Sequence, residues 1–193
     1  MRIYENPQKT SENRLKARSW YIPEGEGVFR PHNGEWRFAF FENGDKAGNI
    51  EEWETIEVPS CWQAKGYEKP NYTNINYPYP CDPPYVPDIN PMGVYERSFE
   101  LTDGSLDTYL VFEGVSSEVY INGKYVGFTE GSHLMSEFDI TEFVSSGTNT
   151  VRVNVRKWCC GSYLEDQDAF RYNGIFRDVY ILSRPHGIFL ILI

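Results

Sequence analysis

Short segments in which apolar and polar residues alternate fill the sequence from residue 94 to residue 182. The clearest is VRVNVR (residues 151–156), where valine occupies every second position and Arg or Asn fills the others. A side-chain period of two belongs to a β-strand with one face buried and the other in water. Asn122-Gly123 lies between the strand-like runs EVYI and KYVGF, and it is a strong hairpin signal because both central turn positions favour positive φ. The pattern therefore predicts an antiparallel, all-β fold.

Turn signals separate the expected strands and helical periodicity is scarce, which favours two packed sheets. Strands are expected at residues 36–40, 55–58, 94–101, 108–112, 118–121, 124–128, 138–140, 151–155 and 179–182. The segment 138–140 is short and is predicted to be an edge strand.

The predicted organisation is one all-β sandwich domain with flanking segments. Residues 1–30 are polar and weakly periodic, and they are expected to form an extended amino-terminal arm that lies on another surface. The β-sandwich is expected over residues 31–183. Residues 184–193 are expected to be a linker or the truncated start of a further domain, because the terminal GIFLILI resembles a strand without partners.

The charge balance excludes one class of partner. The 28 acidic and 18 basic side chains give a formal net charge of -10, whereas a nucleic-acid-binding surface needs clustered Lys and Arg. Four cysteines without metal-ligand spacing indicate free thiols in a reducing compartment. The start MRIYENPQKT lacks the apolar run of a secretory signal, and no stretch reaches the length of a membrane span. We therefore expect a cytoplasmic protein that binds neither nucleic acid nor a membrane.

The segment SYLEDQD contains the densest group of carboxylates, namely Glu165, Asp166 and Asp168. Their oxygens could bind a hard cation or accept hydrogen bonds from sugar hydroxyls, and a solvated acidic turn is the alternative. A complete glycosidase centre is not expected here. A retaining enzyme needs a proton donor and a nucleophile about 5 Å apart, and nothing marks one of these acids as the proton donor.

The segment NYTNINYP (residues 71–78) is rich in asparagine and tyrosine. Asparagine can pair with neighbouring hydroxyls, and tyrosine offers an apolar wall with a polar tip, so the segment could bind a sugar. Ordinary turn chemistry explains it equally well. The proline-rich residues 78–91 predict a stiff surface loop lined with Tyr77, Tyr79 and Tyr85, and long loops of this kind are usually functional. The three histidines stand singly and are expected at the surface: His32, His133 and His186.

Several long motifs together are similar to those of one known family. They are ENPQKTSENRLKAR, NGEWRFAF, VPSCWQAKGYEKPNYTNINYPY, PPYVPDINPMGVYERSFEL and SYLEDQDAFRYNGIFRDVYIL. In this order they resemble the amino-terminal region of family 2 glycoside hydrolases of the large β-galactosidase type. The resemblance runs from about Asn6 to Leu182. β-Glucuronidases and β-mannosidases share the sandwich but not the combined YTN and EDQD segments.

The resemblance implies a galactose-binding-like jelly roll that packs against a (β/α)8 barrel, and the barrel carries both catalytic glutamates. The parent would be a retaining β-galactosidase, and this chain would contain no catalytic residue and be inactive alone. Asn74 and Asp168 would contact the sugar of a β-galactoside such as lactose, and Asp168 would also help to hold sodium. Magnesium would bind the parent through ligands outside this chain. The arm, residues 1–30, would help the full-length enzyme to form a homo-oligomer.

Two features depart from the family pattern. Asp168 is followed by Ala169 and Phe170, where the family often has a bulky residue and then Trp, and GIFLILI does not resemble the family's next segment. Two other hypotheses remain. A stand-alone carbohydrate-binding, lectin-like module would need a complete concave pocket within these residues. An assembly element would use the arm and the apolar end as interfaces.

Overall fold

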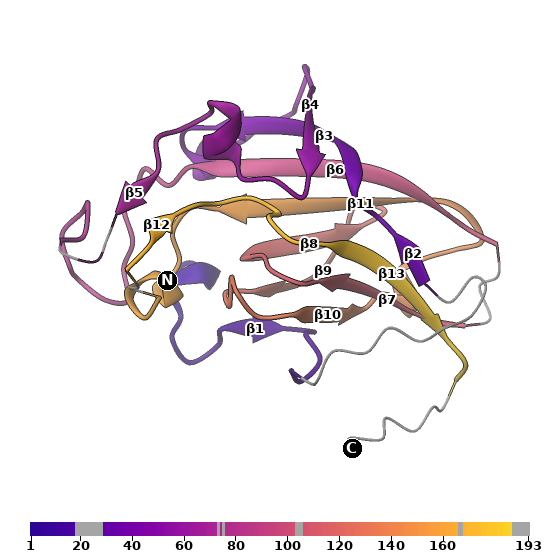
Figure 1. Ribbon diagram of the computed structural model, residues 1–193. Coiled ribbons are helices and arrows are strands. Elements are labelled where there is room, and N and C mark those ends of the chain that lie inside the picture. Colours follow the sequence, from indigo (N-terminus) through magenta and orange to yellow (C-terminus); the bar gives the residue numbers. More distant parts are fainter. Residues whose placement is uncertain (18–28, 73, 75, 103–105, 166–167, 187–193) are drawn as a thin grey trace.

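The chain folds into two antiparallel sheets and a short ribbon (Figure 1). This computed structural model describes residues 1–17, 29–72, 74, 76–102, 106–165 and 168–186. The larger sheet has the strand order β1 (Ser11–Glu12), β9 (Lys124–Thr129), β8 (Ser117–Ile121), β11 (Gly147–Arg156), β6 (Met92–Leu101), β3 (Gly34–Phe41) and β4 (Glu54–Val58). The smaller sheet has the order β10 (Ser136–Asp139), β7 (Asp107–Phe112), β13 (Val179–Arg184) and β2 (Phe29–Pro31). The ribbon pairs β5 (Asn71–Tyr72) with β12 (Phe170–Arg171).

The predicted all-β sandwich is confirmed, and each predicted segment overlaps a strand. Valine side chains at positions 151, 153 and 155 are buried, whereas Arg152 between them is exposed. The hairpin of β8 and β9 turns at Asn122 and Gly123, whose φ values of 52° and 77° are those of a primed turn. β10 is an edge strand of the smaller sheet, as predicted for residues 138–140.

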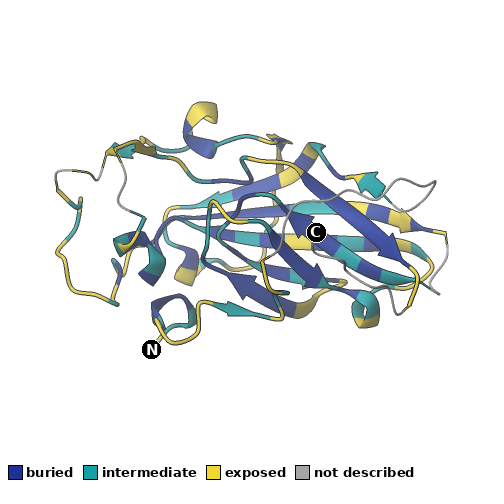
Figure 2. Cartoon of the chain, turned by 60° about the horizontal axis from the view of Figure 1, so that its bottom comes forward, coloured by how far each residue is buried: buried dark blue, intermediate teal, exposed yellow. Residues whose placement is uncertain are grey.

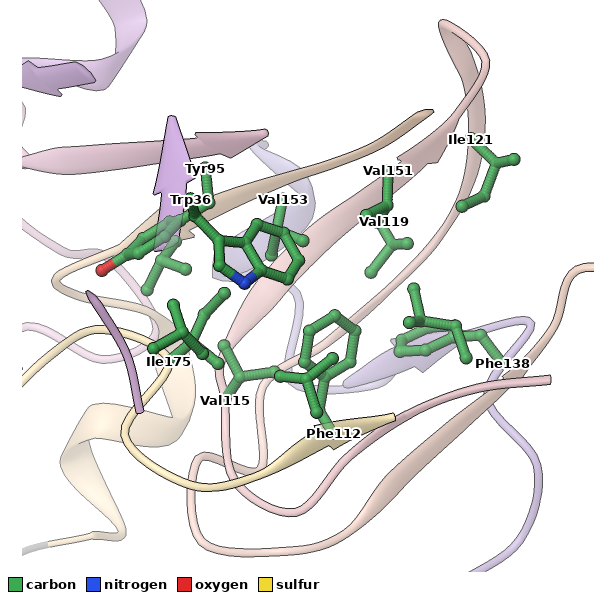
Figure 3. Close-up of a cluster of buried hydrophobic side chains, with 14 of the residues drawn as sticks. Trp36, Tyr95, Phe112, Val115, Val119, Ile121, Phe138, Val151, Val153 and Ile175 are labelled. Carbon is green, nitrogen blue, oxygen red and sulfur yellow. The ribbon is translucent and has the colours of Figure 1, made fainter. Parts of the chain in front are cut away.

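The core fills the space between the two sheets, and Figure 3 shows part of it. Trp36 of β3 and Tyr95 of β6 face Phe112 of β7, Phe138 of β10 and the loop residue Ile175, all nearly inaccessible to water. Figure 2 shows that buried and exposed positions alternate along several strands, which is the pattern of a sheet with one wet face. Burial of these large side chains supplies the main driving force for folding.

The first part of the arm packs on the sandwich itself. β1 pairs with β9 at the edge of the larger sheet, and the Leu15 amide donates to the carbonyl of Glu137 in β10 at 2.8 Å. The arm therefore covers one edge of each sheet, which would otherwise expose unpaired backbone groups. Tyr4 anchors its start in a small cluster with Val86 and Trp158. Residues 18–28 lie outside the described residues, and β2 begins at Phe29, ahead of the expected boundary at residue 31.

Helices in the described part of the chain are 3-10 turns of three or four residues, and none of them could cross a membrane. They are η1 (Ile3–Glu5), η2 (Gly44–Lys46), η3 (Trp62–Lys65), η4 (Thr141–Phe143) and η5 (Cys160–Tyr163). The expectation for GIFLILI falls on residues 187–193, outside the described part.

One prediction about the histidines was wrong. His32 is buried, with 5% of its surface exposed, and its ring packs edge-on against Trp36 and Phe99. Burial, together with the nearby Arg97 charge, lowers the pKa of His32 to about 3, so the ring is neutral at physiological pH. The sequence around it, RPHNGEW, resembles a polar turn, and nothing in its periodicity reveals that position 32 faces the core.

Candidate functional site

The two segments singled out in the sequence meet in the β5–β12 ribbon. Tyr72 pairs with Phe170 and Asn71 with Arg171, although these pairs join residues almost a hundred positions apart in the chain. Figure 1 places the ribbon at one end of the sandwich, away from the end at which β13 leaves it. The ribbon therefore brings the NYTNINYP and SYLEDQD segments to one rim of the domain.

Asn74 and Asp168 are linked through the hydroxyl of Tyr72. The Asn74 side-chain amide donates to the Tyr72 oxygen at 3.3 Å, and the Tyr72 hydroxyl donates to Oδ1 of Asp168. The side chains of both Asn74 and Asp168 are exposed. An amide and a carboxylate that the sequence predicted as sugar contacts thus lie on the same rim and face solvent.

Aromatic rings border this pair of polar groups. Phe170 lies edge-on to Tyr72 with ring centroids 5.7 Å apart, and Tyr172 follows at 6.2 Å from Phe170. Phe170 exposes 58% of its surface, which is unusual for a large apolar side chain. The family resemblance led us to expect Trp at this position, and Phe170 places an aromatic ring against Tyr72.

Glu165, the other described carboxylate of the acidic segment, does not join this pair. Glu165 is half-buried, accepts hydrogen bonds from the Ser132 hydroxyl at 2.9 Å, and forms an ion pair with Arg171 at 3.0 Å. These contacts tie Glu165 to Ser132 and to Arg171 of β12, so Glu165 has a structural role. Asp166 lies outside the described residues. Asp168 is therefore the exposed acid of this segment in the described part of the chain.

The chemistry of Asp168 suits a hard cation, but Asp168 alone cannot complete a site. Oδ1 accepts from the Tyr72 hydroxyl, and among the described residues Oδ2 has no hydrogen-bond donor, so it could bind a ligand. Hard cations bind several oxygens at once. Within the described ranges, no group of three or more His, Cys, Asp or Glu side chains could hold a metal ion. Further ligands would have to come from water, sugar hydroxyls or other parts of a larger protein.

A cavity of about 190 Å³ lies behind the ribbon, lined in part by Phe170, Arg171 and Tyr172. Its lining includes neither Asn74 nor Asp168. Pockets that enclose a small-molecule ligand are typically about 300–1,000 Å³. The rim that carries the two polar groups is thus an open surface that offers one wall of a binding site.

The proline-rich loop packs against η5 and Trp158. The Tyr77 hydroxyl donates to the carbonyl of Tyr163 at 2.9 Å, and the Tyr79 ring packs on Trp158 with centroids 4.9 Å apart. Tyr85 remains half exposed, while its carbonyl accepts from the hydroxyl of Tyr163. The predicted stiff loop is thus anchored on η5, and two of its tyrosines have packing roles.

Sequence reasoning did not predict that the Tyr72 hydroxyl contacts both Asn74 and Asp168. Tyr72 and Asn74 are two positions apart in the sequence, and this spacing places two side chains on the same face wherever a segment is extended. That spacing could have indicated their contact. The contact with Asp168 had no comparable signal, because strands of two residues carry no measurable periodicity.

The two packed antiparallel sheets define an all-β sandwich domain, and comparison with known proteins identifies its family. Residues 29–185 match the family described as "Glycosyl hydrolases family 2, sugar binding domain". The chain belongs to this family.

The relatives are much longer than this chain. It is 44% identical over 196 residues to a β-galactosidase of Kluyveromyces lactis, an alignment that covers 93% of the chain and 19% of that protein. It is 42% identical over 202 residues to a β-galactosidase of Actinobacillus pleuropneumoniae, covering 95% of the chain and 20% of that protein. The chain thus spans about a fifth of the length of these relatives and corresponds to their amino-terminal domain.

Solved structures confirm the fold. A β-glucuronidase of an uncultured Clostridium sp. superimposes with a TM-score of 0.61 at 22% identity, covering 87% of this chain and 31% of that one. A Ruminococcus gnavus β-glucuronidase bound to D-glucaro-d-lactam gives a TM-score of 0.64 at 18% identity, covering 89% and 32%. At these identities the likeness concerns the β-sandwich alone.

Proposed function

We propose that this chain is the amino-terminal domain of a retaining β-galactosidase that hydrolyses terminal β-D-galactosides such as lactose. In this proposal the domain supplies Asn74 and Asp168 as contacts to the sugar. The observation that carries it is the link of both side chains to the Tyr72 hydroxyl on one exposed rim. The identity of 42–44% to proteins named β-galactosidase supports the choice of substrate class.

The catalytic step requires groups that this rim does not provide. A retaining glycosidase uses a proton donor and a nucleophile about 5 Å apart. Asp168 is a single exposed carboxylate, and Glu165 is held by Ser132 and Arg171. We therefore assign both catalytic glutamates to a barrel domain in the remaining part of the parent enzyme, and we expect this chain alone to be inactive.

Asn74 and Asp168 would act by orienting the sugar. An amide and a carboxylate can hold neighbouring hydroxyls in a defined direction, and such orientation lowers the entropic part of the barrier. The free oxygen of Asp168 would also contribute one ligand to a sodium ion beside the sugar. Sodium would neutralise part of the local negative charge and fix hydroxyl positions. Magnesium would bind the parent through residues outside this chain.

The other partners follow from the same proposal. The remaining domains of the parent enzyme would cover the open rim, and the arm would contribute to a homo-oligomer. A cytoplasmic location fits the four cysteines, which are all free. A formal net charge of -10 does not favour nucleic acid as a partner.

A stand-alone, lectin-like module is the less favoured alternative. The relatives contain this domain as about a fifth of a longer chain. The rim is an open surface that would cover only one side of a sugar. Calorimetric titration of the isolated chain with galactose would favour the module if binding were millimolar or tighter.

The proposal is tested by kinetics of the full-length protein with a chromogenic galactoside. Replacing Asp168 with Asn should lower kcat/KM about 10- to 100-fold, the range for loss of a hydrogen bond to a charged group. Replacing Asn74 with Ala should lower it several-fold. Asn76→Ala, an exposed amide in the same segment, is the matched control and should have little effect. Unchanged kinetics in Asp168→Asn, or turnover by the isolated chain, would contradict the proposal.

A further inference from the structure

We infer that Tyr72 is a positioning residue: its hydroxyl, held by Asn74, fixes the Asp168 carboxylate in the orientation that receives the sugar and its cation. This inference rests on the proposed function and deepens it. It is based on the two hydrogen bonds that connect the Asn74 amide, the Tyr72 hydroxyl and Oδ1 of Asp168.

The direction of the hydrogen bonds follows from proton counting. A phenol has one proton, and the ionised Asp168 carboxylate can only accept. The Tyr72 hydroxyl therefore donates its hydrogen bond to Asp168, and the Tyr72 oxygen accepts one from Asn74. Asn74 must present its NH2 group to Tyr72, so its carbonyl oxygen remains for a sugar hydroxyl. These two hydrogen bonds leave Asn74 Oδ1 and Asp168 Oδ2 as acceptors for the sugar or its cation.

The side chains of Asn74 and Asp168 require such positioning because both are exposed and lie in irregular backbone. Asp168 is in the bend before β12, and Asn74 follows β5 by two positions. An exposed side chain on a bend populates several rotamers, and ordering it on binding costs about 0.5–1.5 kcal/mol. A hydrogen bond to the charged carboxylate selects one rotamer before the sugar arrives.

Tyr72 itself is held by its place in the ribbon. Its backbone pairs with that of Phe170, and the two rings meet edge-on at a centroid distance of 5.7 Å and an interplanar angle of 63°. Cross-strand aromatic pairs of this kind stabilise a ribbon modestly. The ring contact fixes the direction of the Tyr72 hydroxyl, so Phe170 supports the carboxylate through Tyr72.

The test is the substitution Tyr72→Phe, which removes the hydroxyl and keeps the ring. In the full-length protein we expect kcat/KM for a chromogenic galactoside to fall about tenfold, and the sodium concentration for half-maximal activity to rise about tenfold. Saturating sodium should restore much of the activity, because the cation then reorders the carboxylate. Asp168→Asn should not be rescued in this way. Tyr125→Phe, a partly exposed tyrosine of β9 outside the rim, is the matched control.

A second readout uses the 193-residue chain without sugar, metal or turnover. In its NMR spectrum the side-chain NH2 signals of Asn74 should shift in Tyr72→Phe and stay in place in Tyr125→Phe. A purely structural role for Tyr72 would predict a lower unfolding temperature instead, with the sodium dependence unchanged.

The outcomes separate this inference from the proposed function. If Asp168→Asn impairs turnover but Tyr72→Phe behaves like the wild type, the positioning role is overturned while the sugar contact stands. If Asp168→Asn has no effect, the proposed function fails first. An unmoved Asn74 signal in Tyr72→Phe would overturn the hydrogen-bonded chain independently of any activity.

Discussion

Phe170 lies directly opposite Tyr72 across the β5–β12 ribbon, and the two rings meet edge-on. The contact joins the two segments that carry Asn74 and Asp168. It is made by a residue that is more than half exposed in this chain. We interpret this exposed ring as a support for the rim, and its replacement tests that view.

Phe170→Ala should loosen the ribbon with little effect on overall stability. The lost cross-strand contact is worth about 0.2–1 kcal/mol, and Phe170 contributes nothing to the main core. Backbone amides of the ribbon should therefore exchange with deuterium faster in Phe170→Ala, whereas Phe170→Trp should protect them as well as the wild type. Equal exchange rates in the wild type and Phe170→Ala would show that the ring contact does not hold the ribbon.

Gly93→Ala should strongly destabilise the sandwich. A Cβ at this position in β6 would lie 2.8 Å from ring carbons of Phe38 and Trp62, which are both buried. Overpacking of this kind costs about 1–3 kcal/mol. Gly48→Ala is the control, because a Cβ there has no neighbour within 4 Å. Gly93→Ala should unfold at a lower urea concentration than Gly48→Ala. Equal unfolding midpoints would contradict the packing around Gly93.

Gly127→Ala should displace the arm. The added Cβ would clash with the backbone carbonyl oxygen of Glu12, so β1 could no longer pair with β9 at its present distance. Trypsin should then cut faster after Arg14 and Lys16 than in the wild type, while the sandwich stays folded. Unchanged cleavage rates would mean that the arm tolerates the extra methyl group, and that its docking is looser than the structure indicates.

Glu130 should make stability fall as pH rises. Its side chain is 3% exposed, and burial raises the pKa of the Glu130 carboxyl to about 7, although hydrogen bonds from the Cys160 thiol and the Gly161 amide oppose the shift. Because the folded state holds its proton more tightly than the unfolded state, the folded state binds more protons between about pH 4.5 and 7. The free energy of unfolding therefore decreases through the titration of Glu130 as the pH rises across that window. Above the window Glu130 causes no further change.

The matched variant for this effect is Glu130→Gln, which keeps the shape and removes the titration. Other groups also titrate in this range, so the informative quantity is the difference in unfolding free energy between variant and wild type. That difference should grow in favour of Glu130→Gln by on the order of 2 kcal/mol from pH 4.5 to pH 8. A difference independent of pH, measured by urea unfolding, would show that Glu130 titrates normally.

The sandwich could be predicted from the sequence because its long strands obey a period of two. The valines of β11 and the Asn122-Gly123 turn each report local geometry that the final fold retains. The pairing of β1, β2, β5 and β12 could not be predicted, since strands of two or three residues have no periodicity. Their positions depend on contacts between distant residues, such as the ring pair of Tyr72 and Phe170.

The candidate site was predicted only in part. Asn74 and Asp168 were named from their chemistry and from a family resemblance, and the structure places both beside Tyr72. The acidic segment alone did not distinguish Asp168 from Glu165. That distinction depends on Arg171 and Ser132, which occupy Glu165. Such pairings arise from tertiary packing and cannot be seen in a single sequence.

The most direct test of the central claim is a crystal structure of the full-length protein with galactose and sodium bound. Our account predicts sugar hydroxyls within about 3.2 Å of the carbonyl oxygen of Asn74 and the free oxygen of Asp168, with the Tyr72 hydroxyl still bonded to Oδ1. Galactose bound elsewhere, with the rim of β5 and β12 facing bulk solvent or covered by protein without sugar contact, would contradict it.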